Sequence, residues 1–116
     1  LLENMLQPSL DPIIEKAVAY IDAHLAQELT LDQITKSIHT SKSTLYRSFH
    51  THFHCTISEY ISRKRIDKSI ELLRSSEDLS VEDISRQTGF SSATNFIRTF
   101  KKLEGVTPLK FRKLQE

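Results

Sequence analysis

The chain has 116 residues, of which 38% are hydrophobic, with only two Gly, three Pro and one Cys. This length suits one domain, or two very small ones that share an element. The scarcity of turn residues argues against a β-rich fold, and the apolar content suits compact helical cores rather than a deep enzyme cleft. The single Cys55 excludes an internal disulfide framework and fits a reducing cytoplasm.

Hydropathy and charge narrow the class of protein further. No apolar run approaches the ~20 residues that span a bilayer, and no signal segment opens the chain. Residues 41–74 carry seven Lys or Arg against three acids, and residues 86–113 carry seven against Glu104 alone, whereas residues 75–85 hold only acids among their charged residues. Two basic blocks separated by an acidic joint indicate two patches that face one polyanion, although ordinary solvated helix faces would give the same pattern.

The chain opens with a predicted linker over residues 1–10 and continues with an amphipathic helix. The helix is expected from about Asp11 to Ala26. Its apolar face is formed by Ile13, Ile14, Ala17, Val18, Ile21 and Leu25. Because the first residue is Leu1 rather than Met, we expect the chain to be a piece of a longer protein.

The spacing of the next segment is typical of a helix-turn-helix. Thr30 can cap a short helix that runs to about Ile38, since its hydroxyl can accept hydrogen bonds from the amides of the first turn. After a turn, Ser41 can cap a longer helix whose buried side carries Leu45 and Phe49. A short helix, a turn and a longer helix define the motif.

A connecting helix is predicted over residues 57–75. Its apolar side is formed by Ile57, Tyr60, Ile61, Ile66, Ile70 and Leu73. The segment beyond it repeats the first unit. Residues 30–34 (TLDQI) match residues 80–84 (SVEDI), and residues 47–49 (RSF) match residues 98–100 (RTF) after a slip of one residue.

The repeat predicts a second helix-turn-helix unit. Ser80 and Ser92 take the two cap positions, and the buried side of the longer helix is expected at Phe96, Phe100 and Leu103. A last short helix is expected to start at Pro108 behind Thr107. We therefore predict an all-α fold of seven helices, with helix-turn-helix subdomains at residues 11–56 and 76–116 joined by the long linker helix.

Several stretches resemble the signature of AraC/XylS-family transcription activators. They are Gly89-Phe90-Ser91-Ser92, Phe96 to Lys102, Gly105-Val106-Thr107-Pro108 and Phe111-Arg112, with Ser41 to Phe49 and Thr56 to Tyr60 similar to the first half of the same domain. The resemblance covers nearly the whole chain. It implies two recognition helices that enter successive major-groove segments on one face of double-stranded DNA.

The sequence departs from the family pattern at three positions. His39 and His54 stand where the family usually has Gly, and Ile57 stands where Pro is common. Without Gly, the turn at His39 is expected to need a positive φ, which His tolerates better than most residues.

A recognition helix turns its apolar side to its own core and leaves the opposite face for base edges. The base-reading positions implied by the resemblance are Ser43, Tyr46 and Arg47 in the first unit, and Ala93, Thr94, Asn95, Ile97 and Arg98 in the second. Arg47 and Arg98 can each bond bidentately to guanine, contact a phosphate or form a surface salt bridge.

The other base-reading candidates also have alternatives. Tyr46 can pack on a thymine methyl, reach a phosphate or stay partly buried, and Asn95 can instead support the start of its helix. Ala93 and Ile97 can offer only apolar contacts to thymine methyls. The candidates for contacts with the DNA backbone are Ser41, Lys42, His50, Arg63, Lys64, Ser92, Lys101 and Lys102. Part of the run Arg63-Lys64-Arg65 must face solvent or the acids of the linker helix instead.

The sequence supports neither a metal site nor an enzyme. His50, His52, His54 and Cys55 are close in sequence, but a spacing of two separates side chains by about 200° on a helix, so they do not converge. Neither a Gly-rich phosphate loop nor a paired acid and base is present. We expect no cofactor and no catalytic activity.

The sequence thus predicts a DNA-binding domain that regulates transcription and is monomeric as a DNA reader. We expect activation, further contacts with RNA polymerase, a separate N-terminal sensory or dimerisation domain, no membrane partner, and a place in the bacterial cytoplasm at the nucleoid. The alternative is a protein-interaction module whose basic helices bind acidic partners.

Overall fold

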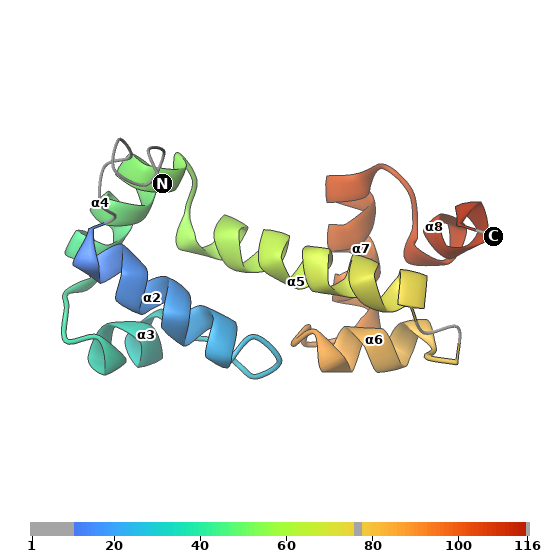
Figure 1. The fold of residues 1–116 in the computed structure, drawn as a ribbon, viewed down its shortest axis with the longest axis horizontal. Helices are drawn as coiled ribbons and strands as arrows, with labels where there is room; N and C mark the ends of the chain where they lie inside the picture. The colour runs from blue at the N-terminus through green and yellow to red at the C-terminus, as the bar shows by residue number, and fades with distance from the viewer. Residues whose placement is uncertain (1–10, 76–77, 116) are drawn as a thin grey trace, which may run out of the picture. The chain divides into compact units, whose positions relative to one another are not determined.

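The computed structural model describes residues 11–75 and 78–115, and these form seven α-helices and no strand (Figure 1). The predicted all-α fold of seven helices is confirmed. The linker predicted at residues 1–10 lies outside the described residues. Contacts divide the described chain into two compact units: unit 1 holds residues 11–23 and 29–57, and unit 2 holds residues 24–28 and 58–115.

Unit 1 contains α2 (Pro12–Ala23), α3 (Leu31–Ser37) and α4 (Lys42–Phe53), each in contact with the other two. Its fully buried apolar side chains are Ile14, Ala17, Ile21, Ile34, Leu45 and Phe49. Their spacing of three or four residues along each helix explains why these segments are helical and which side of each faces the core.

The helices of unit 1 begin at capped ends. The Thr30 hydroxyl accepts a hydrogen bond from the amide of Gln33, and the Gln33 side chain accepts one from the amide of Thr30. Ser41 accepts in the same way from the amide of Thr44 at 3.2 Å, which starts α4. These bonds satisfy amides that a helix leaves without partners.

Unit 2 contains α6 (Val81–Gln87), α7 (Ala93–Glu104), α8 (Pro108–Leu114) and nearly all of α5 (Ile57–Ser75). Its core consists of Ile66 and Leu73 from α5, Ile84 from α6, and Phe96 and Phe100 from α7. The rings of residues 90, 96, 100 and 111 lie in sequence, with centroids 5.1, 5.8 and 5.6 Å apart. These ring contacts join α7 to the turn before it and to α8.

The first helix ends earlier than predicted. α2 stops at Ala23, and residues 24–28 belong to unit 2 instead. Arg65 of α5 donates hydrogen bonds to the carbonyls of Leu25, at 3.2 Å, and Gln27, at 2.8 Å. The segment forms a local turn, with the amide of Gln27 donating to the carbonyl of His24 at 2.9 Å, and it also holds Arg65 through these two carbonyls. Leu25 continues the apolar spacing of α2 although it lies beyond the helix end.

Leu103 also differs from the sequence-based prediction, which places it on the buried side of α7. Its side chain is 38% exposed, although it lies on the same side of α7 as Phe96 and Phe100. The core cluster ends at Phe100, and the last turn of α7 extends beyond it. Leu103 instead lines a groove of about 250 Å³ together with Ser58, Glu59, Ser62, Thr99 and Lys102.

The backbone of the two units repeats as closely as the sequence does. His39 has a φ of 55°, which confirms the predicted positive φ, and Gly89 occupies the matching turn with a φ of 86°. His54 ends α4 in the left-handed conformation with a φ of 56°, as Gly105 ends α7 with a φ of 83°. The duplicated geometry persists where the residue type differs.

Candidate nucleic-acid interface

The longer helix of unit 1, α4, has one buried side and one exposed side. Leu45 and Phe49 of α4 are fully buried in the core. The predicted outward positions are all exposed; they are Ser43, Tyr46, Arg47 and His50. Tyr46 is 52% exposed, so its ring is available on the surface instead of being packed in the core.

Ser48 anchors α4 to the rest of unit 1 from the buried side. Its hydroxyl donates a hydrogen bond of 3.3 Å to Asp11, whose other carboxylate oxygen accepts from the amide of Ile13 at the start of α2. Sequence reasoning missed this link, because Asp11 and Ser48 are 37 positions apart. Together with the buried Leu45 and Phe49, it holds the side of α4 that carries Ser48 toward the interior of unit 1.

The longer helix of unit 2 has the same division. Phe96 and Phe100 are fully buried in α7, while Thr94, Ile97, Arg98 and Lys101 are exposed. Ile97 is 38% exposed and lines an open cavity of about 570 Å³. The walls of the cavity are completed by Ser80, Val81, Glu82, Thr107, Pro108, Leu109 and Arg112.

Ala93 and Asn95 are less accessible than the other predicted base-reading positions. Both are half-buried. The side-chain amide of Asn95 donates to the hydroxyl of Ser91 at 3.3 Å, and its backbone amide donates to the Ser92 hydroxyl at 3.0 Å. The second bond is the backbone cap of α7 by Ser92, whereas the first is a contact of the Asn95 side chain just before the helix. The side-chain contact is compatible with the alternative that the sequence left open, in which Asn95 supports the start of the helix.

The cationic candidates at the start of α4 and the end of α7 are at the surface. Lys101 and Lys102 are exposed in the last turn of α7. Lys42 forms an ion pair of 2.8 Å with Asp32, and both side chains are more than half exposed. The hydrogen bond from Lys42 lowers the pKa of Asp32, and the same bond raises the pKa of Lys42. An exposed pair of this kind is weak enough for a phosphate to displace.

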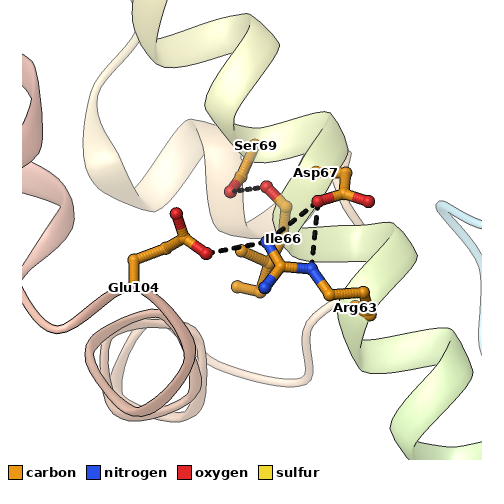
Figure 2. A network of polar contacts seen from close by, with 5 residues as sticks. All are labelled: Arg63, Ile66, Asp67, Ser69 and Glu104. Atoms are coloured by element: carbon orange, nitrogen blue, oxygen red, sulfur yellow. Dashed lines mark hydrogen bonds and ion pairs between the residues drawn. The ribbon is translucent and has the colours of Figure 1, made fainter.

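The basic run of α5 is largely engaged within unit 2. Figure 2 shows the guanidinium of Arg63 between the carboxylates of Asp67 and Glu104, 2.9 and 2.7 Å from its Nη2. Lys64 lies over the ring of Tyr60, with its Nζ 5.6 Å from the centroid. Arg65 donates to backbone carbonyls, and its burial lowers its pKa. The sequence anticipated acids of the linker helix as partners, but not Glu104 or the carbonyls.

Two further properties of the described residues concern metal binding and membrane crossing. Within residues 11–75 and 78–115, no three His, Cys, Asp or Glu side chains are grouped so that they could hold a metal ion. None of the helices in this part of the chain is long and apolar enough to cross a membrane.

These features define the class of protein. Each unit has a short capped helix, a turn with positive φ and a longer helix whose outward side is polar and basic, which is the arrangement of a double helix-turn-helix protein. A family model described as "Helix-turn-helix domain" matches residues 34–114. SoxS, a regulatory protein of Escherichia coli strain K12, is 34% identical over 100 residues, covering 86% of this chain and 92% of SoxS. The chain belongs to the AraC/XylS family of helix-turn-helix transcription regulators.

Solved structures share the fold. The C-terminal domain of AraT, a response regulator from Geobacillus stearothermophilus, superposes with a TM-score of 0.87 at 30% identity, over 92% of this chain and 88% of that one. The DNA-binding domain of AdpA, solved in complex with a target DNA, superposes with a TM-score of 0.82 over 90% of this chain and 92% of that one. Its identity of 24% shows a shared fold alone.

Many relatives are longer proteins. Four curated regulators that are 31% to 36% identical to this chain are matched over only 16% to 34% of their own length. The chain therefore corresponds to a minor part of those proteins.

Proposed function

We propose that this domain reads a bipartite DNA site, with α4 and α7 each placed in one of two successive major-groove segments. The observation that carries the proposal is the division of each helix into a buried apolar side and an exposed polar and basic side. A recognition helix needs this division, because its inner side holds it to the unit while its outer side meets base edges. The AdpA domain, with the same fold, was solved on its target DNA.

Base readout is assigned to the outward side chains of the two helices. In α4 these are Ser43, Tyr46 and Arg47, and in α7 they are Thr94, Ile97 and Arg98, with Ala93 and Asn95 at the margin. Arg47 and Arg98 have the planar fork that guanine O6 and N7 can accept bidentately, and Tyr46 and Ile97 can contact thymine methyls. The side-chain amide of Asn95 also donates to Ser91 before the helix, so we place Asn95 at the margin of this face.

Contacts with the DNA backbone are assigned to the polar and cationic side chains beside these faces. They are Ser41, Lys42, His50, Lys64, Ser92, Lys101 and Lys102. These contacts would position the domain and carry no sequence information. Arg63 was also a candidate, but its guanidinium is already bound by two carboxylates.

We place the domain in a bacterial transcription activator that acts in the cytoplasm at the nucleoid, where its DNA is. An N-terminal sensory or dimerisation domain and RNA polymerase are its proposed protein partners. We also propose that the domain has no membrane partner and is not an enzyme. The greater length of the relatives supports a separate sensory part.

The salt dependence of the binding affinity tests whether the domain binds DNA. Each neutralised phosphate releases counterions, so log K should fall against log salt with a slope of about −0.9 per phosphate contacted. Binding to a duplex selected from random sequences would be measured by fluorescence anisotropy between low and physiological salt. A flat dependence would contradict DNA binding. Equal affinity for all duplexes would favour the protein-interaction module instead.

A pair of variants in α7 separates base readout from backbone contact. Arg98→Ala should cost about 1–3 kcal/mol on the selected site and relax the preference at one or two base pairs, because a bidentate guanine contact carries base identity. Lys102→Ala should weaken binding to all sequences about equally. The measurement is an affinity series over single-base variants of the site. If Arg98→Ala lowers every affinity by the same factor, Arg98 contacts the backbone.

A further inference from the structure

The last turn of α7 is held to unit 2 differently from the rest of the helix. Its first turns are fixed by Phe96 and Phe100, which are fully buried against α5 and α6. In the last turn, Lys101, Lys102 and Leu103 are exposed. Glu104 is the side chain of this turn that turns inward, with 22% exposure.

The guanidinium that Glu104 binds is also bound by Asp67. Nε and Nη2 of Arg63 donate to one oxygen of Asp67 at 3.0 and 2.9 Å, one helical turn along α5. The same Nη2 donates to Glu104 at 2.7 Å across 41 positions of sequence. Figure 2 shows Glu104 approaching from the neighbouring helix while Asp67 braces the fork from α5 itself. The two bonds to Asp67 therefore restrict the rotamers in which Arg63 can bind Glu104.

The charges of this triad are unsuited to a phosphate. Two carboxylates surround one guanidinium, so the group carries a net negative charge. Hydrogen bonding to Glu104 raises the pKa of Arg63, which stays fully protonated. A phosphate would have to displace a carboxylate from Arg63 and then remain beside both acids.

We propose that Arg63 and Glu104 are positioning residues of the second recognition helix: their ion pair, braced by Asp67, sets the angle at which α7 presents Thr94, Ile97 and Arg98 to DNA. The inference rests on the proposed function, because it assigns a role in base readout. It replaces the phosphate contact expected for Arg63 from the sequence.

The two roles predict different results for the same substitutions. If Arg63 bound a phosphate, Arg63→Gln would make the slope of log K against log salt shallower by about 0.9, and Glu104→Gln would release Arg63 and strengthen binding to every duplex. If the pair positions α7, Arg63→Gln leaves the slope unchanged. Both substitutions then reduce discrimination in the half-motif that contacts α7, while the half-motif that contacts α4 is discriminated as before.

The experiment measures, for each variant, the salt slope and the ratio of affinities for the selected site and for single-base changes in each half-motif. Arg98→Ala identifies which half-motif contacts α7. For Arg63→Gln and Glu104→Gln we expect this ratio to fall about two- to fivefold, the range typical of a partly exposed ion pair. The double variant should show no greater loss than either single one.

Two further variants separate geometry from charge. Glu71→Gln removes a carboxylate from the same helix α5, where it pairs with Lys68 at 3.2 Å, and should leave the ratio unchanged. Glu104→Asp keeps the charge but shortens the side chain, so it should lower the ratio as Glu104→Gln does. Circular dichroism and thermal unfolding establish that each variant is folded before its binding is compared.

The outcomes distinguish this inference from the proposed function. A wild-type domain that shows no preference among duplexes would refute the proposed function. A wild-type domain with a preference that Arg63→Gln and Glu104→Asp both retain in full would refute the positioning role alone. A shallower salt slope for Arg63→Gln would return Arg63 to the backbone contacts.

Discussion

Gly89 and Gly105 share a backbone conformation but not an environment. Both have a positive φ, of 86° and 83°. A Cβ at Gly89 would lie 2.2 Å from the carbonyl oxygen of Leu25 and 2.9 Å from Nε of Arg65, whereas a Cβ at Gly105 would have no atom within 4 Å. Gly89 is thus required by close packing as well as by φ.

This difference predicts unequal effects of the same substitution. Gly105→Ala should lower the free energy of unfolding by about 1 kcal/mol, the cost of a left-handed Ala. Gly89→Ala should lower it by at least about 3 kcal/mol, because the Leu25 carbonyl must also move and its hydrogen bond from Arg65 is lost. Urea unfolding followed by circular dichroism measures both, and both sites lie in unit 2. Equal losses would show that the segment of residues 24–28 is not firmly held.

His39 and His54 show how far a single residue can be predicted. The expected positive φ at His39 is confirmed, because the turn in a repeated motif sets the backbone and not the residue that occupies it. The burial of Leu103 was predicted from the same kind of reasoning and is wrong. Periodicity reports the side of a helix, but it does not report where along the helix the core ends.

Among the helices, α3 and α6 repeat the same capped start. In α6 the Ser80 hydroxyl accepts from the amide of Asp83 at 3.0 Å, and the Asp83 carboxylate accepts from the amide of Ser80 at 3.2 Å. Hydrogen bonding from Ser80 lowers the pKa of Asp83 below its ordinary value of 3.8. The capping interaction is therefore a source of acid sensitivity.

The sign of this sensitivity follows from the lowered pKa. A carboxylate whose folded pKa is depressed contributes stability that is present above the unfolded value and is lost as the pH falls through the folded value. Asp83→Ala should therefore be less stable than wild type near neutral pH, with a difference that shrinks as the pH falls below about 4. Thermal unfolding across pH 2.5–7 measures the difference.

Glu82→Ala is the matched control, because Glu82 lies in the same first turn and is exposed. It removes an acid near the helix start without removing the cap. A difference between Asp83→Ala and wild type that stays constant from neutral pH down to pH 2.5 would mean that the Asp83 carboxylate does not supply the cap's stability.

At the level of the whole molecule, the side chains proposed for base readout differ between the two units. The outward positions of α4 are Ser43, Tyr46 and Arg47, while those of α7 include Thr94, Ile97 and Arg98. The two half-motifs of the bound site should accordingly differ in sequence. Both should lie on one face of the duplex, about one helical turn or ~10 base pairs apart.

Selection from random duplexes followed by footprinting measures this arrangement. Inserting about 5 base pairs between the half-motifs turns one of them to the opposite face, so binding should fall to the level of a single half-motif. Removing one half-motif altogether serves as the reference. A perfect palindrome bound by a dimer of this domain would contradict the tandem model.

The sequence by itself determined which segments are helical, because the interactions that form and start a helix lie within a few residues of one another. Apolar spacing sets the buried side of each helix, and the hydroxyls of Thr30, Ser41, Ser80, Ser92 and Thr107 start five of them within three residues of the cap. The matching of residues 30–34 with residues 80–84 also identified the duplicated unit.

Only the tertiary structure decided which arginine side chains have a hydrogen-bonding partner elsewhere in the protein. Beyond the end of α2, the carbonyls of Leu25 and Gln27 accept hydrogen bonds from Arg65, and Arg63 is bound by Glu104, in each case across about 40 positions of sequence. In the sequence, an arginine held by a distant carboxylate looks the same as one that faces solvent. The partner is determined by how the helices pack, since a hydrogen bond forms only where packing brings the donor within about 3 Å of an acceptor.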